Sequence, residues 1–254
     1  MNPSPRPIDN DDIYRVCEIA HQAREGHIGS SLSILNILNV VYGHWVRGGV
    51  TFILSKGHAS LGLYIILNKY GLISDSQLTS FCRPDSILGG HPDCLKVPGI
   101  FGSTGSLGHG LPLAVGRALA QRASSGGTRI VVLVGDGEVN EGTHWECFLL
   151  AAHHKLDNLV CVVDFNGSSE RALSVKSVPK AVSALGWEGR EVDGHDEAEL
   201  AQAIFAPANH SPRLVWARTV KGRGVSYMEG NPEWHHKWPS KDELLRIKTE
   251  LGIA

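Results

Sequence analysis

The sequence has little net charge, no long apolar stretch and no closely spaced cysteine pair, and each of these features excludes a class of protein. The formal net charge is −2 over 254 residues, which gives no electrostatic reason to expect binding to nucleic acid or to an anionic membrane. The chain is 42% hydrophobic, but it lacks a run of roughly eighteen apolar residues, the length that crosses a bilayer. We therefore expect no membrane-spanning helix.

The five cysteines are an odd number without CxxC spacing (Cys17, Cys82, Cys94, Cys147 and Cys161). Two of them fall inside a predicted helix and a predicted strand, which favours buried thiols over disulfides. The first residues are polar and proline-rich and lack an apolar signal region. We therefore expect a cytoplasmic protein that forms one domain over residues 1–254, with a short disordered lead over residues 1–9.

The stretch from Gly135 to Asn166 is the most informative part of the chain. An apolar, β-branched run over 130–134 predicts a buried parallel strand, and it stops at Gly135-Asp136-Gly137. A helical pattern over 141–152 and a second buried run over 159–163 follow, and the latter leads into Asn166. In a strand–helix–strand unit the two strand ends lie side by side at the carboxyl edge of the sheet, where ligands of open α/β folds bind.

The side chains at these two strand ends suit a hard cation. A carboxylate oxygen from Asp136 and an amide oxygen from Asn166 are ligands that Mg²⁺ prefers, with Ca²⁺ or Mn²⁺ as alternative ions. Mg²⁺ would also keep coordination positions open for phosphate oxygens. The competing interpretation is an ordinary strand–helix turn in which Asp136 caps the helix.

Three histidines lie beside glycines at the boundaries of predicted elements. His27 stands between predicted helices over 11–24 and 32–45, His58 begins a helix over 61–70, and His91 follows Gly90 in a loop. Histidine suits proton transfer or hydrogen bonding to sugar hydroxyls near neutral pH, so we expect a shared polar lining. A plain turn residue is the alternative for His27. Zinc is not favoured, because only His91 has a nearby co-ligand, Cys94, and no second pair completes a site.

A glycine-rich run over 102–110 precedes an apolar helix expected over 111–120. Such a turn at a helix N-terminus is suited to anion binding. It does not have the GxGxxG pattern after a strand, and no acidic residue follows at the offset used for ribose. The run therefore gives little support to a nicotinamide site.

Taken together, these motifs resemble those of transketolases, and the resemblance runs from about Ile13 to Pro239. The order is the same as in that family, and the likeness is greatest to the separately encoded N-terminal half of two-chain transketolases. The motifs that carry it are Gly26-His27-Ile28-Gly29, Leu54-Ser55-Lys56-Gly57-His58, Gly90-His91-Pro92, Thr104-Gly105-Ser106-Leu107-Gly108, Gly135-Asp136-Gly137 with Asn166, and Trp234-His235-His236-Lys237-Trp238-Pro239.

The resemblance implies an α/β thiamine-diphosphate-binding fold, with a mostly parallel central sheet flanked by helices. It also implies roles for particular residues. Metal ligands would be Asp136, Asn166 and the main chain of Ser168. The cofactor would contact Gly105, Ser106, Leu107, Gly135, Asp136, Gly137, Glu138, Asn166, His58 and His235. Catalytic roles would fall to His27, His58, His91, His235 and Glu141, the last within a carboxylate network that links two active sites.

The sequence departs from the family pattern at three places, one of which is a shorter connection between Val46 and Phe52 that should alter the rim of the channel. The family's Asp-Gly pair after the metal-binding asparagine is replaced by Gly167-Ser168-Ser169-Glu170-Arg171-Ala172, so the metal loop is expected to differ in shape. Near the C-terminus His236 stands in place of a glycine and Trp238 in place of an alanine. These bulkier residues predict a tighter or repositioned loop.

One part of the transketolase machinery has no counterpart in this chain. In that family a glutamate on a second domain protonates the aminopyrimidine ring, and that domain also recognises much of the sugar phosphate. We therefore expect a partner, the C-terminal subunit with the pyrimidine-binding domain, in an α₂β₂ complex. The expected reaction is ketol transfer from a phosphorylated ketose to an aldose. The rivals are the alpha subunit of a thiamine-dependent 2-oxo-acid dehydrogenase and a catalytically silent paralogue.

Overall fold

A computed structural model describes residues 6–124, 127–170, 172–207 and 209–253. Part of the expected N-terminal lead, residues 1–5, lies outside the described residues. Helix α1 begins at Asn10, and its N-cap is Asp9, whose side chain accepts a hydrogen bond from the Asp12 amide while the Asp12 side chain accepts one from the Asp9 amide. This reciprocal pair fixes the start of the helix.

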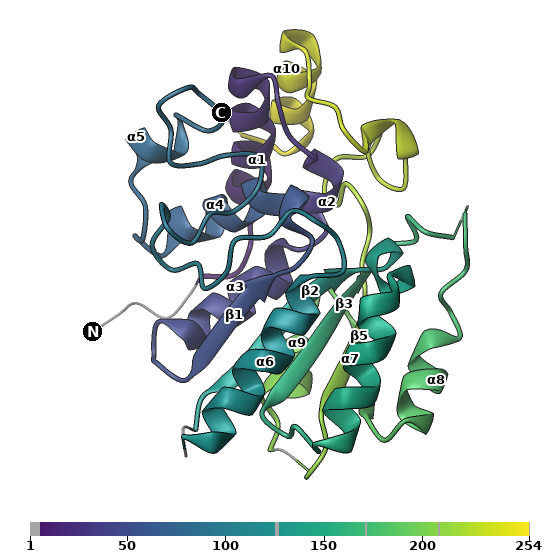
Figure 1. Cartoon of the computed structure of the whole chain (residues 1–254). Coiled ribbons are helices and arrows are strands. Elements are labelled where there is room, and N and C mark those ends of the chain that lie inside the picture. Colours follow the sequence, from purple (N-terminus) through teal and green to yellow (C-terminus); the bar gives the residue numbers. More distant parts are fainter. Residues whose placement is uncertain (1–5, 125–126, 171, 208, 254) are drawn as a thin grey trace.

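Five parallel strands form one sheet in the order β1-β2-β3-β5-β4. The expected parallel α/β architecture is therefore confirmed (Figure 1). Their bounds are β1 Val50–Leu54, β2 Arg129–Gly135, β3 Leu159–Phe165, β4 Glu188–Asp193 and β5 Arg213–Arg218.

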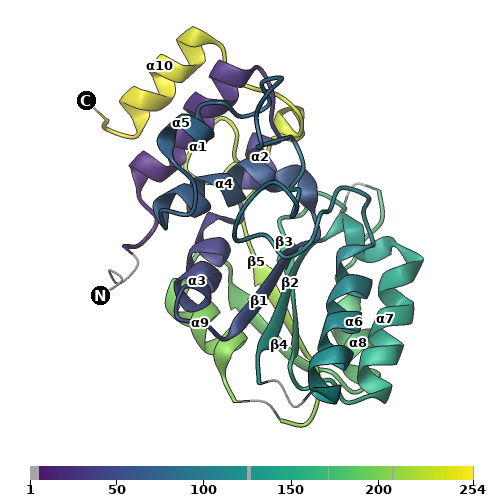
Figure 2. The same cartoon turned by 60° about the vertical axis from the view of Figure 1, so that its left-hand side comes forward.

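Helices cover both faces of this sheet and one end of it. Helices α6, α7 and α8 lie on one face and α3 and α9 on the other, while α1, α4 and α10 lie beyond the end at the top of the view (Figure 1 and Figure 2). Their bounds are α1 Asn10–Ala23, α2 Ile28–Leu32, α3 Leu35–Trp45, α4 Ser60–Lys69, α5 Asp75–Leu78, α6 Gly110–Ala123, α7 Gly142–His153, α8 Val178–Ala184, α9 Glu197–Phe205 and α10 Lys241–Glu250, with short 3₁₀ turns η1 Gly57–Ala59, η2 Gly137–Asn140 and η3 Pro232–Trp234.

The alternation of side chains along the central strands divides the core into two clusters. In β2, Val131 and Leu133 belong to the cluster under α3 and α9, whereas Ile130, Val132 and Val134 belong to the cluster under α6, α7 and α8. Because helices cover both faces of the sheet, side chains on both sides of β2 are apolar. The sequence of β2 is therefore a continuous hydrophobic run, as is typical of a parallel strand buried on both faces.

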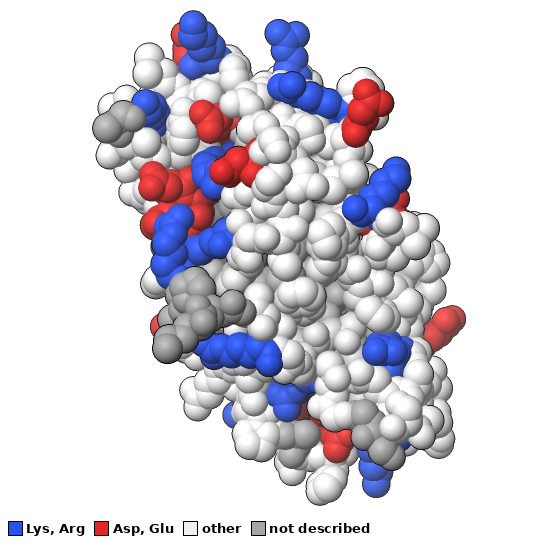
Figure 3. All heavy atoms as spheres, turned by 90° about the vertical axis from the view of Figure 1, so that its left-hand side faces the viewer, with Lys and Arg blue, Asp and Glu red and all other residues white. Residues whose placement is uncertain are grey.

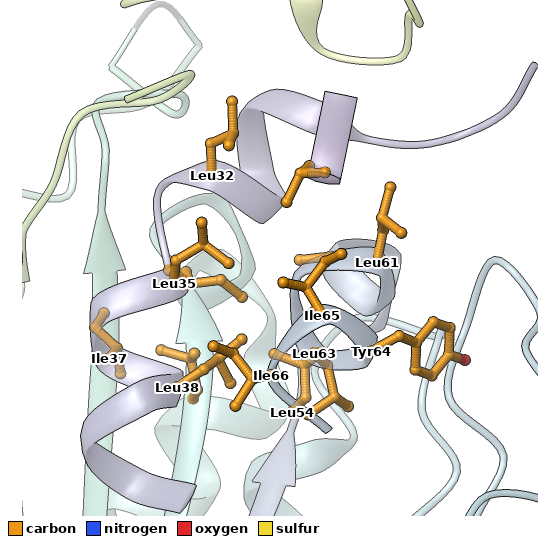
Figure 4. Close-up of a cluster of buried hydrophobic side chains, with 14 of the residues drawn as sticks. Leu32, Leu35, Ile37, Leu38, Leu54, Leu61, Leu63, Tyr64, Ile65 and Ile66 are labelled. Atoms are coloured by element: carbon orange, nitrogen blue, oxygen red, sulfur yellow. The ribbon is translucent and has the colours of Figure 1, made fainter. Parts of the chain in front are cut away.

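The first cluster extends past the sheet into the helices that carry the candidate site. Leu35 and Leu38 on α3 pack with Leu61 and Ile65 on α4 and with Leu54 at the end of β1 (Figure 4). All five side chains are buried. This packing fixes the starts of α2 and α4, which are the points where His27 and His58 stand.

The helix expected over 32–45 begins instead at Leu35 as α3, and most of the preceding segment, expected as a turn, forms the short helix α2, which is separated from α3 by a break at Ser33 and Ile34. The Ser33 hydroxyl donates to the main-chain carbonyl of Ser30 at 3.1 Å and to Asp164 Oδ2 at 2.8 Å. A serine side chain that bonds to nearby backbone and to another element competes with helix continuation. Hydrophobic periodicity could not indicate this break, because the apolar positions continue across it.

The surface agrees with the near-zero net charge. On the face shown in Figure 3, Lys, Arg, Asp and Glu lie mainly around the margin, and no broad patch of one sign covers it. Within the described residues, no helix combines the length and the apolar character that crossing a membrane requires.

Replacing Phe148 with alanine tests the second cluster. Phe148 on α7 is fully buried, so Phe148→Ala should lower the free energy of unfolding by about 3–5 kcal/mol, the usual cost of such a cavity. The neighbouring Leu149 is 57% exposed, and Leu149→Ala should change it by no more than about 0.5 kcal/mol. Urea unfolding of the isolated chain measures both, and equal effects would contradict this core assignment.

Candidate active site

The strand ends of β2 and β3 meet as the sequence predicts. Gly135 pairs with Asp164 in the parallel ladder, and the Asp136 amide donates to the Asp164 carbonyl at 3.2 Å. Asp136 and Asn166 therefore follow neighbouring strands at one edge of the sheet, and both line the same cavity. Asp136 is buried, whereas Asn166 is partly exposed.

This cavity has a volume of about 380 Å³. Its walls come from the starts of α2 and α4, the loops before α6, the turns after β2 and β3, and the segment after η3. The lining residues are His27, Ser30, Lys56, His58, His91, Gly105, Leu107, Gly135, Asp136, Gly137, Glu138, Asn166, Ser168 and His235.

Four predicted histidines line this cavity together. The His27 ring centroid lies 5.0 Å from that of His58 and 5.5 Å from that of His235, and His58 and His235 are 6.2 Å apart. His91 reaches the cavity over Gly105, where a Cβ atom would lie 3.1 Å from the imidazole of His91. The histidines come from four segments of the chain, and the fold gathers their rings on one side of the strand ends.

The cavity keeps the imidazoles of His27, His58 and His235 neutral. Burial lowers the pKa of His58 to about 2, with a further contribution from the charge of Lys56. Burial also lowers the pKa of His27 to about 4, helped by the neighbouring His236 and His235. For His235 the pKa is likewise lowered, first by burial and then by Lys221. A neutral imidazole offers one donor and one acceptor, which suits binding to hydroxyl groups.

Asp164 organises the polar side of the site. It is fully buried at the end of β3, and its Oδ2 accepts hydrogen bonds from Lys56 Nζ at 2.5 Å, Ser33 Oγ at 2.8 Å and Asn166 Nδ2 at 2.8 Å. Its Oδ1 accepts one from Thr219 Oγ1. The side chains of four separate segments are thus held by a single carboxylate.

The orientation of Asn166 follows from this contact. Because its amide nitrogen donates to Asp164, its Oδ1 points the other way, where it accepts from the amide of Ser168 at 3.1 Å. Asp136 Oδ1 accepts from the Gly137 amide at 2.7 Å, whereas Oδ2 has only a long contact of 3.5 Å with the Ser169 amide. Asp136 therefore caps the short turn η2 and not the helix α7, whose N-cap is Glu141, and it still has an oxygen with little engagement.

These residues fit a divalent cation. Asp136 and Asn166 supply hard oxygen donors, the main chain of Ser168 contacts Asn166, and the next amide, that of Ser169, lies 3.5 Å from Asp136 Oδ2. Burial and the charge of Asp164 raise the pKa of Asp136. The ionised form of this carboxylate is therefore disfavoured in the cavity and would be stabilised by a bound cation. The hydroxyl of Ser169 nearby is buried and has no hydrogen-bond partner among the residues that the structure describes, as expected of a loop shaped for a group that is bound during function.

Glu138 lines the cavity but is engaged by protein groups. Its Oε1 accepts from the Ser55 hydroxyl and from the Gly108 amide at 2.9 Å, and its Oε2 accepts from the Gly135 amide at 3.1 Å. These bonds join the end of β1, the glycine-rich loop and the end of β2. Glu138 therefore holds the walls of the cavity together.

Two of the predicted residues do not line the cavity. Ser106 is exposed beside Gly105 and Leu107, which do line it. Glu141 is also exposed, at the N-cap of α7. Since strand and loop patterns do not give the direction of a side chain, the sequence could not separate Ser106 from its neighbours.

Three further residues at the site were given no role by the sequence analysis. Ser30 and Lys56 line the cavity, and Lys221 Nζ lies 2.6 Å from His235 Nδ1 and 3.2 Å from Ser168 Oγ. Lys56 and Lys221 each follow a buried strand. The strand-end rule that selected Asp136 and Asn166, applied to the ends of β1 and β5, would have selected both lysines.

Comparisons with known proteins identify relatives over most of the chain. Residues 13–254 match the family model described as transketolase, thiamine diphosphate binding domain. Relatives that are named as one subunit of apulose-4-phosphate transketolase occur in Actinobacillus succinogenes, with 39% identity over 91% of this chain and 90% of that protein, and in Phocaeicola vulgatus, with 37% identity over 94% and 90%. The crystal structure of transketolase from Campylobacter jejuni superposes with a TM-score of 0.86 at 28% identity, over 96% of this chain and 42% of that one.

The neutral state of His58 can be tested by NMR. The resonance of its ring carbon-bound proton should stay constant between about pH 7 and 5, the range in which an unperturbed imidazole titrates. The reason is the pKa of about 2 that burial and Lys56 impose. Comparison with His58→Asn assigns the resonance, and a titration midpoint near the ordinary value of about 6.5 would contradict the result.

Proposed function

Because the chain belongs to the family of thiamine-diphosphate-binding domains of transketolases, we propose that it is the N-terminal subunit of a two-subunit transketolase. The complex transfers a two-carbon ketol unit from a phosphorylated ketose to an aldose. The observation that supports this most is the convergence of Asp136 and Asn166 on one cavity with four histidines. Metal ligands alone would suit only the binding of a phosphate group. The four histidines add side chains that can transfer protons, which a catalytic site needs.

In this proposal the chain holds the diphosphate end of the cofactor. Asp136, Asn166 and the main chain of Ser168 would bind Mg²⁺, while Gly105 and Leu107 would lie against the cofactor. Lys56 is already paired with Asp164, whereas Lys221 contacts Ser168 and His235 beside the metal ligands and can pair with an anionic group in the cavity. When bound, thiamine diphosphate supplies the electron sink that ketol transfer needs.

The histidines act on the sugar hydroxyls. His27, His58 and His235 are neutral at physiological pH because of their lowered pKa values. His27 and His58 can therefore each accept a proton from a hydroxyl at one ring nitrogen and donate a hydrogen bond from the other. His235 Nδ1 already accepts a hydrogen bond from Lys221 Nζ, so its Nε2 carries the hydrogen and donates to a hydroxyl. We assign to these side chains and His91 the orientation of donor and acceptor hydroxyls and the movement of protons at them.

The need for a partner is supported by exposed apolar side chains on α6, on α7 and on the loop before α6. Leu107 and Leu113 are each 40% exposed at the loop before α6 and on α6, and Leu149 and Leu150 are 57% and 43% exposed on α7. Gathered apolar side chains of this size on adjacent elements are typical of an interaction surface. We propose that the partner subunit covers them, completes the site with its pyrimidine-binding domain and assembles with this chain as α₂β₂. Glu141, exposed at the start of α7, would then contact that interface.

The names of the relatives suggest the first substrate to test. Apulose 4-phosphate is the compound named for the relatives in A. succinogenes and P. vulgatus. We propose a phosphorylated ketose donor of this class for the present chain. Release of carbon dioxide from a 2-oxo acid would instead favour the dehydrogenase alternative, and cofactor binding without turnover would favour a silent paralogue.

The isolated chain should not turn over. Incubated with thiamine diphosphate, Mg²⁺, a ketose phosphate and an aldose, it should give no ketol transfer, because protonation of the aminopyrimidine ring is assigned to the partner. Addition of the partner subunit should start the reaction, and light scattering should give the mass of an α₂β₂ complex. Full turnover by the chain alone would refute this part of the proposal.

Removal of the Asp136 carboxylate should abolish Mg²⁺-dependent cofactor binding. In the complex, Asp136→Ala should weaken thiamine diphosphate binding at least about 100-fold, because even changes outside the first coordination shell cost about 10–100-fold in metal affinity. Titration calorimetry measures the affinity, with the exposed Asp85 replaced in the same way as a control. Unchanged affinity in Asp136→Ala would rule out the metal assignment.

A further inference from the structure

A second group of metal-ligating side chains lies beside the cavity, and the proposed reaction does not use it as a group. One ligand atom each from Glu25, His27 and His236 lie within 4.8 Å of one another. His27 lines the cavity, whereas Glu25 and His236 do not. His236 is also the residue that stands where transketolases resembling this chain carry a glycine, so this group is not explained by the family pattern.

Backbone and side-chain contacts hold these three residues together. A parallel β-bridge joins His27 to Lys237, which places the segment after η3 against the turn before α2. The Glu25 Oε1 atom accepts a hydrogen bond from the Gly26 amide at 3.0 Å and lies 2.7 Å from His236 Nε2. The His27 and His236 ring centroids are 4.6 Å apart. The cluster is thus built from two segments that are far apart in the sequence.

The kind of ligand follows from the donor set. Two imidazole nitrogens and one carboxylate oxygen are typical of zinc and related transition metals, whereas Mg²⁺ takes oxygen ligands. Zinc bonds of about 2.0–2.2 Å at tetrahedral angles separate neighbouring ligand atoms by roughly 3.3 Å. That separation lies between the 2.7 Å contact and the 4.8 Å limit observed here, so small side-chain rotations would form the site.

Access to the site is open. The side chains of His236 and Glu25 are 50% and 38% exposed, so an ion can enter from solvent and keep a water or substrate oxygen as its fourth ligand. A simple ion pair would need only Glu25 and His236. It would not require the third ligand, His27, to lie in reach of both.

We propose that Glu25, His27 and His236 bind a divalent transition metal of the zinc class, at a site separate from the Mg²⁺ site of Asp136 and Asn166. Because His27 faces the cavity, a metal bound there withdraws its imidazole from the sugar hydroxyls and inhibits ketol transfer. Metal binding stands on the contacts above, whereas the inhibition rests on the proposed function.

The binding arm of the test uses Co²⁺ and Zn²⁺ on the full-length chain, with and without its partner subunit. Co²⁺ should give the visible absorption of a low-coordinate nitrogen and oxygen site, and Zn²⁺ should displace it. Glu25→Gln and His236→Ala should each weaken Zn²⁺ binding by more than about 100-fold, since the loss of a direct ligand exceeds the cost of an outer-shell change. His153→Ala is the matched control, because His153 and His154 form an exposed histidine pair with ring centroids 5.0 Å apart.

Binding that survives both Glu25→Gln and His236→Ala, or that falls equally in His153→Ala, would overturn the site. The activity arm compares Zn²⁺ inhibition of the wild-type complex with that of the His236→Ala complex, each at saturating Mg²⁺. Wild-type inhibition that His236→Ala relieves supports the proposal, and inhibition that is equal in both overturns its regulatory part. A wild-type complex that binds Co²⁺ at this site but has no ketol transfer would count against the proposed function and leave the metal site standing.

Discussion

The site depends on one buried carboxylate, that of Asp164, and on the lysine that neutralises it. Both Asp164 and Lys56 are almost completely shielded from solvent. Desolvation of two charges cancels much of their attraction, so such a pair adds little net stability, but loss of one partner leaves an uncompensated charge and costs about 3–5 kcal/mol. The main role of the pair is therefore to fix the positions of other side chains. It holds Lys56 at the end of β1, Ser33 at the break between α2 and α3, and Asn166 after β3 in fixed orientations.

The electrostatics of the cavity follow from this arrangement. Burial raises the pKa of Asp136 and of Glu138 and lowers the pKa of Lys221, so each charged form is disfavoured until an opposite charge is nearby. His27, His58 and His235 respond to the same low polarity by staying neutral. The cavity thus offers carboxylate oxygen atoms that a bound cation would keep ionised on one side and neutral imidazoles on the other. A metal-bound anion and an uncharged polyol can be accommodated together by such a lining.

The fold could be predicted from the sequence to the extent that hydrophobic periodicity encodes it. The strands β2 and β3 are uninterrupted apolar runs, and the rule that parallel strands end at one edge was sufficient to bring Asp136 beside Asn166. The division between α2 and α3 was missed because it arises from Ser33 bonding to Asp164, which is distant in sequence. A pattern of apolar positions carries no information about such a contact.

The residues that form the site could be predicted from the sequence better than the contacts between them. Glycine-flanked histidines indicated a polar lining, and the rings of His27, His58 and His235 do approach one another. Ser106 and Glu141 are exposed and do not line the cavity of this chain, and the sequence could not show this because side-chain direction in a loop or at a helix cap depends on the tertiary fold. The same limitation hid the contact between Glu25 and His236, which are 211 positions apart.

The most direct test of this account is a crystal structure of the complex with thiamine diphosphate and Mn²⁺, an ion that scatters anomalously and takes the same oxygen ligands as Mg²⁺. The account predicts an anomalous peak bonded to Asp136 and Asn166 and to the diphosphate oxygens. A peak bonded to neither side chain, or a diphosphate bound elsewhere, would contradict it.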